Sequence, residues 1–273
     1  MLRYALSLGL LAALALPVDA QSRRPSHCIA IADAAPGMEY VQTASFRAPV
    51  AKGRVRLHYI DHAMFLLATP GGLTAITDYS GWIGNVDFTP TVVTMNHAHE
   101  THFTSYPDPA IPHVLRGWGD AAGPADHHLD LDEMLVRNVP TDIRRGLGGV
   151  EAGGNSIFVF EVEGLCIGHL GHLHHIPDDA QFAALGRLDV VMAPVDGGMT
   201  LDLPSMIDVL TRLRSSIVIP MHWFGESTLQ AFLRGMEGTF EVVDTGGPAL
   251  EVSLRDLPSR PRVVVLWPAA LRE

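Results

Sequence analysis

Short apolar runs, separated by glycines or polar turns, follow one another through the first two-thirds of the chain. Short runs rich in β-branched residues are typical of β-strands. Gly71-Gly72 and Glu163-Gly164 each lie between two such runs at hairpin distance, so the pattern predicts antiparallel pairing. The expected strands are 55–60, 64–68, 73–77, 91–95, 135–139, 157–162 and 165–168.

Beyond residue 177 the pattern alternates between helix and strand. Amphipathic spacing predicts helices at 178–185, 203–213 and 227–236, and further strands are expected at 241–244, 250–254 and 263–266. The runs at 189–193 and 216–220 are almost wholly apolar, which is typical of strands buried on both faces. Helices that cover sheets in one layered α/β domain are the resulting prediction.

An irregular segment interrupts this pattern between residues 103 and 132, where prolines and glycines are frequent. A long loop inside a compact domain is often a binding loop. Surface decoration is the alternative, and the sequence leaves both open.

The first residues have the order of a secretory signal. Arg3 precedes an apolar run at 5–16, then Pro17 and small residues up to Ala20. This order predicts a signal peptide at 1–20, too short to remain as a membrane anchor. An N-terminal extension at 21–54 and one domain at 55–273 follow, and we expect a periplasmic or secreted protein.

Charge and cysteine usage narrow the function. The formal net charge is −11 and Lys52 is the only lysine, which argues against a nucleic-acid surface. We also expect a small-molecule substrate, and no stable membrane anchor because the apolar run at 5–16 is short. An oxidising compartment permits Cys28 and Cys166 to pair, but the sequence does not decide whether they do.

The chain has 14 histidines, several of them in two short tracts. His97 and His99 follow the expected strand at 91–95, where side chains two residues apart point the same way, and His102 approaches from another side. Clustered imidazoles suit a transition metal. A lone histidine is more often a hydrogen-bonded core residue, which is our interpretation of His58 and His113.

The other candidates lie later in the chain. The second tract contains His169, His172 and the pair His174-His175, for which a solvated turn is the alternative. His222 follows the apolar strand at 216–220, and open α/β sheets place site residues at such carboxyl ends.

The run His97-Ala98-His99-Glu100-Thr101-His102 resembles the HxHxDH signature of the metallo-β-lactamase superfamily. Over residues 55–245, further motifs are similar in order and spacing to its ascorbate-lactonase-like branch. These are Asp61-His62-Ala63-Met64-Phe65, Thr77-Asp78, Asn155-Ser156, His169-Leu170-Gly171, Asp189, Pro194-Val195-Asp196-Gly197-Gly198 and Ile219-Pro220-Met221-His222.

This resemblance implies a fold, an activity and a metal. The fold is a four-layer αββα sandwich of two mainly antiparallel or mixed β-sheets flanked by helices. The activity is hydrolysis of an ester, lactone, amide or phosphodiester by a metal-held hydroxide. Zinc is the first expectation, as one or two ions, with iron or manganese as alternatives. Glu100 and Thr101 are possible catalytic helpers, and the implied metal ligands are His97, His99, His102, Asp142, His172 and His222.

Three positions depart from the family pattern. Thr101 replaces an aspartate, Asp142 stands where a histidine is expected, and His172 replaces the bridging aspartate. A carboxylate can bridge two metals, whereas a neutral imidazole offers one lone pair. The remaining ligands suffice for one metal with an open position for water.

Two alternatives to a hydrolase stay open. A non-catalytic member of the same fold would bind metal or a small ligand, and Thr101 favours that interpretation. Redox chemistry at iron is the other, favoured by the histidine-rich ligand set. The sequence has no GxSxG elbow, no P-loop and no GxGxxG after a strand.

Overall fold

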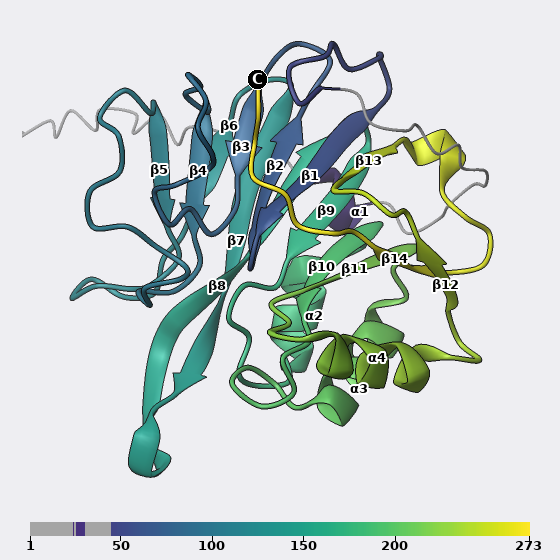
Figure 1. Ribbon diagram of the computed structural model, residues 1–273. Helices are drawn as coiled ribbons and strands as arrows, with labels where there is room; N and C mark the ends of the chain where they lie inside the picture. Colours follow the sequence, from purple (N-terminus) through teal and green to yellow (C-terminus); the bar gives the residue numbers. More distant parts are fainter. Residues whose placement is uncertain (1–23, 25, 31–44) are drawn as a thin grey trace, which may run out of the picture.

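Two mixed β-sheets pack face to face in the computed structural model, which describes residues 24, 26–30 and 45–273 (Figure 1). The predicted signal peptide at 1–20 lies outside the described residues. The first sheet has six strands in the order β13-β1-β2-β3-β4-β5. Their bounds are β1 Val55–Asp61, β2 Met64–Ala68, β3 Thr74–Ile76, β4 Val92–Met95, β5 His113–Arg116 and β13 Ala249–Val252.

The strands of this sheet are antiparallel at one end and parallel at the other. β1 pairs antiparallel with β2 and β13, and β2 pairs antiparallel with β3 across the predicted Gly71-Gly72 hairpin. In contrast, β3, β4 and β5 are parallel. The sheet is therefore mixed, which the predicted fold class allowed, because the long connections at 77–91 and 96–112 return the chain to the same end of the sheet.

The second sheet has eight strands in the order β12-β14-β11-β10-β9-β8-β7-β6. β6 to β9 are antiparallel, with Glu163-Gly164 in the β8–β9 turn as predicted, and the rest are parallel. The bounds are β6 His128–Asp130, β7 Met134–Arg144, β8 Val150–Val162, β9 Leu165–His169, β10 Val190–Pro194, β11 Ile217–Met221, β12 Glu241–Asp244 and β14 Arg262–Val265.

Three predicted helices cover the outer face of the eight-stranded sheet: α2 (Asp179–Leu185), α3 (Leu203–Leu213) and α4 (Glu226–Met236) (Figure 1). Asp178 caps α2 and Asp202 caps α3 by accepting backbone hydrogen bonds. Their apolar sides pack on one buried cluster with β10, β11 and β14.

Side chains alternate between the two faces of each strand, so the six-stranded sheet has a separate hydrophobic cluster on each face. In β1, Val55, Leu57 and Tyr59 point between the sheets, and Tyr59 stacks on Phe65 with ring centroids 4.4 Å apart. Ile60 points the other way, into a cluster that loop side chains cover. The predicted αββα class is confirmed, with loops forming most of the outer layer over the six-stranded sheet.

The sequence pattern missed two short strands and shortened two long ones. β5 and β6 lie inside the segment at 103–132 that was expected to be irregular. β7 and β8 extend beyond the predicted runs and form a hairpin that projects from the body, with the short 3-10 helix Gly146–Gly148 near its tip (Figure 1).

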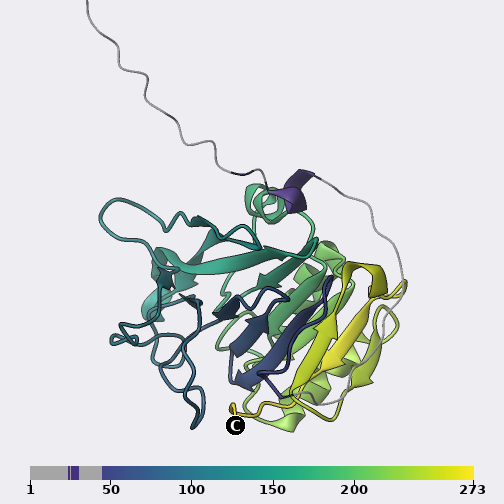
Figure 2. The ribbon, with the colours of Figure 1, turned by 90° about the horizontal axis from the view of Figure 1, so that it is seen from above.

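A disulfide attaches the N-terminal part of the chain to the second sheet. Cys28 and Cys166 are bonded, with their α-carbons 5.8 Å apart, so the pairing that the sequence left open is present. The bond holds the short helix α1 (His27–Ala30) beside α2 (Figure 2). Among the described residues, no helix is long and apolar enough to cross a membrane.

Candidate metal centre

Three histidines from separate turns converge at one edge of the paired sheets. His62 lies in the β1–β2 turn, His102 follows β4, and His222 follows β11. One ring nitrogen from each lies within 4.8 Å of the other two. The rings of His62 and His222 have centroids only 3.9 Å apart. We call this group the histidine trio.

The backbone around the trio adopts an unusual conformation. His62 and Asp78 have φ of 44°, and His222 has φ of 57°, a region that residues other than glycine seldom occupy. The His222 N–H donates to the His62 carbonyl at 2.8 Å, and the Tyr59 hydroxyl donates to the same oxygen at 2.6 Å. Such strain persists where surrounding contacts impose it and is concentrated at functional sites.

Two buried carboxylates orient the rings of His102 and His222. Asp78 Oδ2 is 2.6 Å from His102 Nδ1, and Asp196 Oδ2 is 3.0 Å from His222 Nδ1. Asp78 accepts the His102 Nδ1–H and leaves the Nε2 lone pair of that ring available, an arrangement typical of metal-binding histidines, whereas Asp196 lies against His222 Nδ1 as a close charge contact.

The distance between these two lone pairs fits a bound ion. His102 Nε2 and His222 Nε2 are 3.0 Å apart. Two nitrogens held about 2.0–2.1 Å from a tetrahedral ion are separated by roughly 3.3 Å. The buried His62 Nε2 has no hydrogen-bond partner within the described part of the chain. The donor set therefore fits one transition-metal ion.

The two carboxylates are themselves held in place. Asp78 accepts a hydrogen bond from the Asn96 N–H, and its complete burial raises its pKa to about 6. Burial opposes ionisation of Asp196 as well. However, hydrogen bonds from His222, from the Thr200 hydroxyl and from backbone N–H groups hold the Asp196 pKa well below its usual range.

A second, wider group of histidines flanks the trio. The rings of His97, His99 and His172 are nearly parallel, with centroids 5.6 to 6.3 Å apart. The His172 ring is 4.5 Å from that of His102 and thus connects the two groups. His97 Nδ1 donates to the Gly154 carbonyl at 2.6 Å, which leaves Nε2 available.

Burial keeps the rings of His62, His102 and His172 neutral. It lowers the pKa of His62 to about 3, an effect increased by the neighbouring His222, and it lowers the pKa values of His102 and His172 well below 6.5. Protons therefore compete little with a metal for these lone pairs at neutral pH.

Of the six predicted ligands, the structure brings five together: His97, His99, His102, His172 and His222. Asp142 lies apart from them. The β7–β8 register shifts between Thr141 and Ile143, so Asp142 is exposed and accepts a hydrogen bond from Gly153 N–H. It lines a separate hollow of about 580 Å³ with Asp120 and Glu151.

The two proposed helper residues lie on the surface. Glu100 and Thr101 are exposed, and Thr101 Oγ1 is 3.5 Å from His99 Nδ1. His62 was absent from the predicted ligands, although Asp61-His62-Ala63 is one of the motifs that carried the family resemblance. By contrast, His169 has both ring nitrogens occupied, by Asn96 and by the Ala63 carbonyl, and is structural.

Comparisons with known proteins find chains that are similar to this one. The chain is 26% identical over 210 residues to a UPF0173 metal-dependent hydrolase of Methanoculleus marisnigri, covering 69% of this chain and 91% of that one. A metallo-β-lactamase superfamily protein of Thermotoga maritima has a similar structure, with a TM-score of 0.57 and 24% identity over 78% of this chain and 98% of that chain.

A metallo hydrolase of Ignicoccus hospitalis is also similar, with a TM-score of 0.52 and 16% identity over 73% of this chain and 99% of that one. The family model described as the beta-lactamase superfamily domain matches residues 56–222, which is more than half of the chain and contains the whole trio. The chain therefore belongs to the metallo-β-lactamase superfamily, as its histidine motif indicated.

Proposed function

We propose that this protein is a metal-dependent hydrolase whose ion is held by His62, His102 and His222. The observation that carries the proposal is the pair of Nε2 lone pairs 3.0 Å apart, each on a ring whose Nδ1 faces a buried carboxylate. The matched proteins named above as metal-dependent or metallo hydrolases support the same class of reaction.

Each residue of the centre has a distinct part. The trio supplies three neutral nitrogen ligands, and Asp78 and Asp196 orient two of them and add negative charge behind the rings. A divalent ion with an open position activates water as a nucleophile near neutral pH. Three imidazoles suit zinc best, with iron or manganese as alternatives.

The wider group separates the trio from solvent on one side. His97 and His172 are largely buried, whereas His99 is exposed. A neutral His172 ring has one free lone pair and cannot bridge two metal ions as a carboxylate does. We therefore propose one tightly bound ion.

We also propose that the protein is exported to the periplasm or secreted, and that its substrate is a small molecule. The Cys28–Cys166 disulfide supports an oxidising compartment. We expect the mature protein to begin at Gln21. Intact residues 1–20 on protein recovered outside the cytoplasm would contradict this.

To test the activity, the purified protein is stripped of metal with a chelator, and samples are then reloaded with zinc, iron or manganese. Esters, lactones, amides and phosphodiesters are screened in each state. We expect turnover only in the reloaded protein, and its loss in His102→Gln. His113→Gln is the control, since His113 lies in β5 and was interpreted as structural.

Two outcomes would contradict the proposal. Equal turnover in stripped protein would show that the metal is dispensable. Tight metal binding without turnover in any substrate class would favour the non-catalytic member of the fold.

A further inference from the structure

A hollow opens beside the histidine groups, between the β7–β8 hairpin tip and the turn that follows β9. Its volume is about 550 Å³. The ring of His174, in its wall, has its centroid 4.7 Å from the ring of His172. The lining residues are Arg144, Arg145, Gly146, Gly148, Gly149, Val150, His174, His175 and Met199.

His174, in the wall of this hollow, carries a buried hydrogen-bond donor. Its side chain is largely buried, with the residue only 7% exposed, and its Nδ1 accepts the Arg144 backbone N–H at 2.9 Å. A neutral imidazole that accepts at Nδ1 carries its proton on Nε2 and has no second lone pair for a metal. Within the described residues this buried Nε2–H has no acceptor. A buried donor without a partner is costly, so it indicates an acceptor that binds there.

The positive charges near this hollow are already engaged. The Arg144 guanidinium donates to the carbonyls of Gly198, Met199 and Thr200, and Arg145 pairs with Glu151. A phosphodiester would need cations to replace its hydration, and this wall offers them only by breaking those contacts.

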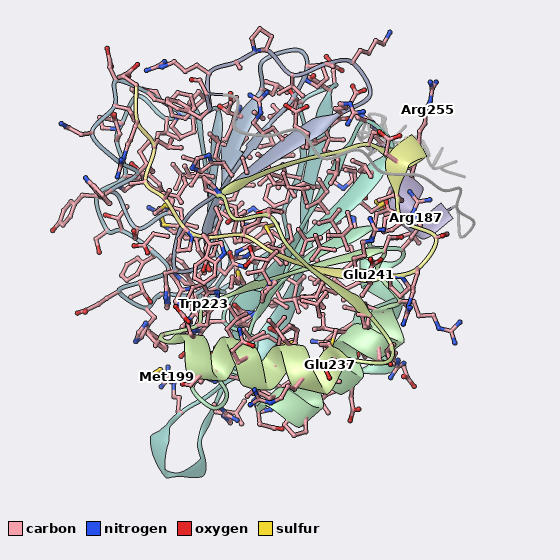
Figure 3. All side chains as sticks on the ribbon, turned by 45° about the vertical axis from the view of Figure 1, so that its right-hand side comes forward. Arg187, Met199, Trp223, Glu237, Glu241 and Arg255 are labelled. Atoms are coloured by element: carbon pink, nitrogen blue, oxygen red, sulfur yellow. A yellow bond between two sulfur atoms is a disulfide. The ribbon has the colours of Figure 1, made fainter. Side chains whose placement is uncertain are left out.

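Apolar side chains occupy the rim. Val150 is 58% exposed and Met199 is 64% exposed, although both side chains are large and hydrophobic. Figure 3 shows Met199 near the projecting hairpin, on the same side of the molecule as Trp223. Exposed apolar groups that rim a hollow beside a candidate metal centre are typical of a ligand site.

We propose that this hollow is the acyl subsite of the enzyme, which takes uncharged aliphatic esters or lactones. His174 donates its Nε2–H to the substrate carbonyl oxygen, and the aliphatic chain lies on Val150 and Met199. This inference rests on the proposed hydrolase function and narrows its substrate class. Hydrolysis adds water across the acyl C–O bond and yields a carboxylic acid and an alcohol from an ester, or one hydroxy acid from a lactone.

The product acids acetate and butyrate serve as binding probes, because their binding is measured without turnover. Calorimetry on the zinc-loaded protein should show butyrate binding about tenfold more tightly than acetate, since two methylenes are buried. Met199→Glu should remove this difference. Val242→Glu, at an exposed apolar position of β12, is the matched control and should keep it.

Two substitutions test the donor. His174→Leu should lower kcat on a butyrate ester by about 10²-fold, as expected for loss of one oxyanion donor, with unchanged zinc content. His174→Gln places an amide N–H near the lost Nε2 and should recover part of the rate. In the metal-free protein, nitrogen NMR should find the His174 proton on Nε2.

Several results would overturn the subsite. These are zinc loss in His174→Leu, a proton on Nδ1, equal binding of acetate and butyrate, or preferential turnover of a phosphodiester. The two proposals fail separately: butyrate selectivity without turnover of any ester refutes only the hydrolase, whereas ester turnover unchanged in His174→Leu refutes only the subsite.

Discussion

His62→Gln should weaken metal binding by about 10² to 10³-fold. Structural zinc sites with four ligands bind with apparent free energies of roughly 10–16 kcal/mol, or about 2.5–4 kcal/mol for each ligand. His62 is one of three histidines whose ligand atoms lie within 4.8 Å of one another. Its substitution leaves His102 and His222, held by Asp78 and Asp196, as a two-nitrogen site.

The affinity is measured by competition with a chromogenic chelator, and the metal content after dialysis is measured separately. His58→Gln is the matched control because His58 lies in β1, the strand that leads directly to His62. Its Nε2 forms a hydrogen bond with the Ala269 carbonyl at 2.8 Å. The amide N–H of a glutamine is able to donate the same hydrogen bond. This control should bind metal like the wild type.

One comparison would refute the reasoning. Wild-type affinity in His62→Gln, together with metal loss in His97→Gln, would place the tightly held ion in the wider group of histidines. Loss of folded protein in His62→Gln is recognised by circular dichroism, and His62→Asn then serves as the second variant.

Three further predictions follow from the site and the fold. Thr101→Asp should raise the occupancy of a second metal by adding a carboxylate beside His99; two metals per wild-type chain after dialysis, unchanged in the variant, would contradict this. Metal-free protein should lose stability to urea as the pH falls from 6.5 towards 4, because burial lowers the pKa of His62 to about 3 and of His174 to about 4, so the unfolded chain binds more protons. Asp78 acts in the opposite direction, because its pKa is raised to about 6 and the folded chain therefore binds the extra proton at this one group. A higher urea midpoint at about pH 5 than at about pH 7.5 would refute the predicted loss of stability. Cys28→Ser should lower the free energy of unfolding by about 2–5 kcal/mol, because the disulfide spans 138 residues; a change below about 1 kcal/mol in urea titration would be inconsistent with that loop-closure effect.

Strand and helix positions were predictable where apolar residues recur at helix or strand spacing over a sufficiently long segment. α3, with 11 residues and one apolar face, was expected at its observed bounds. β5 and β6 were missed because each is short, partly exposed and set among prolines and glycines. Their pairing with β4 and β7 gives them strand geometry that their own residues do not specify.

The site was predictable where ligands cluster in sequence and uncertain where they do not. His97, His99 and His102 belong to one tract, so their proximity could be inferred. His62 stands alone after β1, and only its place in the motif Asp61-His62-Ala63 distinguishes it from a core histidine such as His58. Asp142 was placed by alignment alone, and a one-residue shift in strand pairing turns a side chain to the other face.

The contact between His62 and His222 gives the site a mechanical role. His62 lies in a turn of the six-stranded sheet and His222 directly follows β11 of the eight-stranded sheet, and one backbone hydrogen bond joins them. An ion bound by the trio would crosslink the two sheets at this edge. Removing it should leave the helix-covered core intact while the β1–β2 and β11–α4 turns exchange amide hydrogens faster, so that loading with metal and closure of this sheet edge become one event.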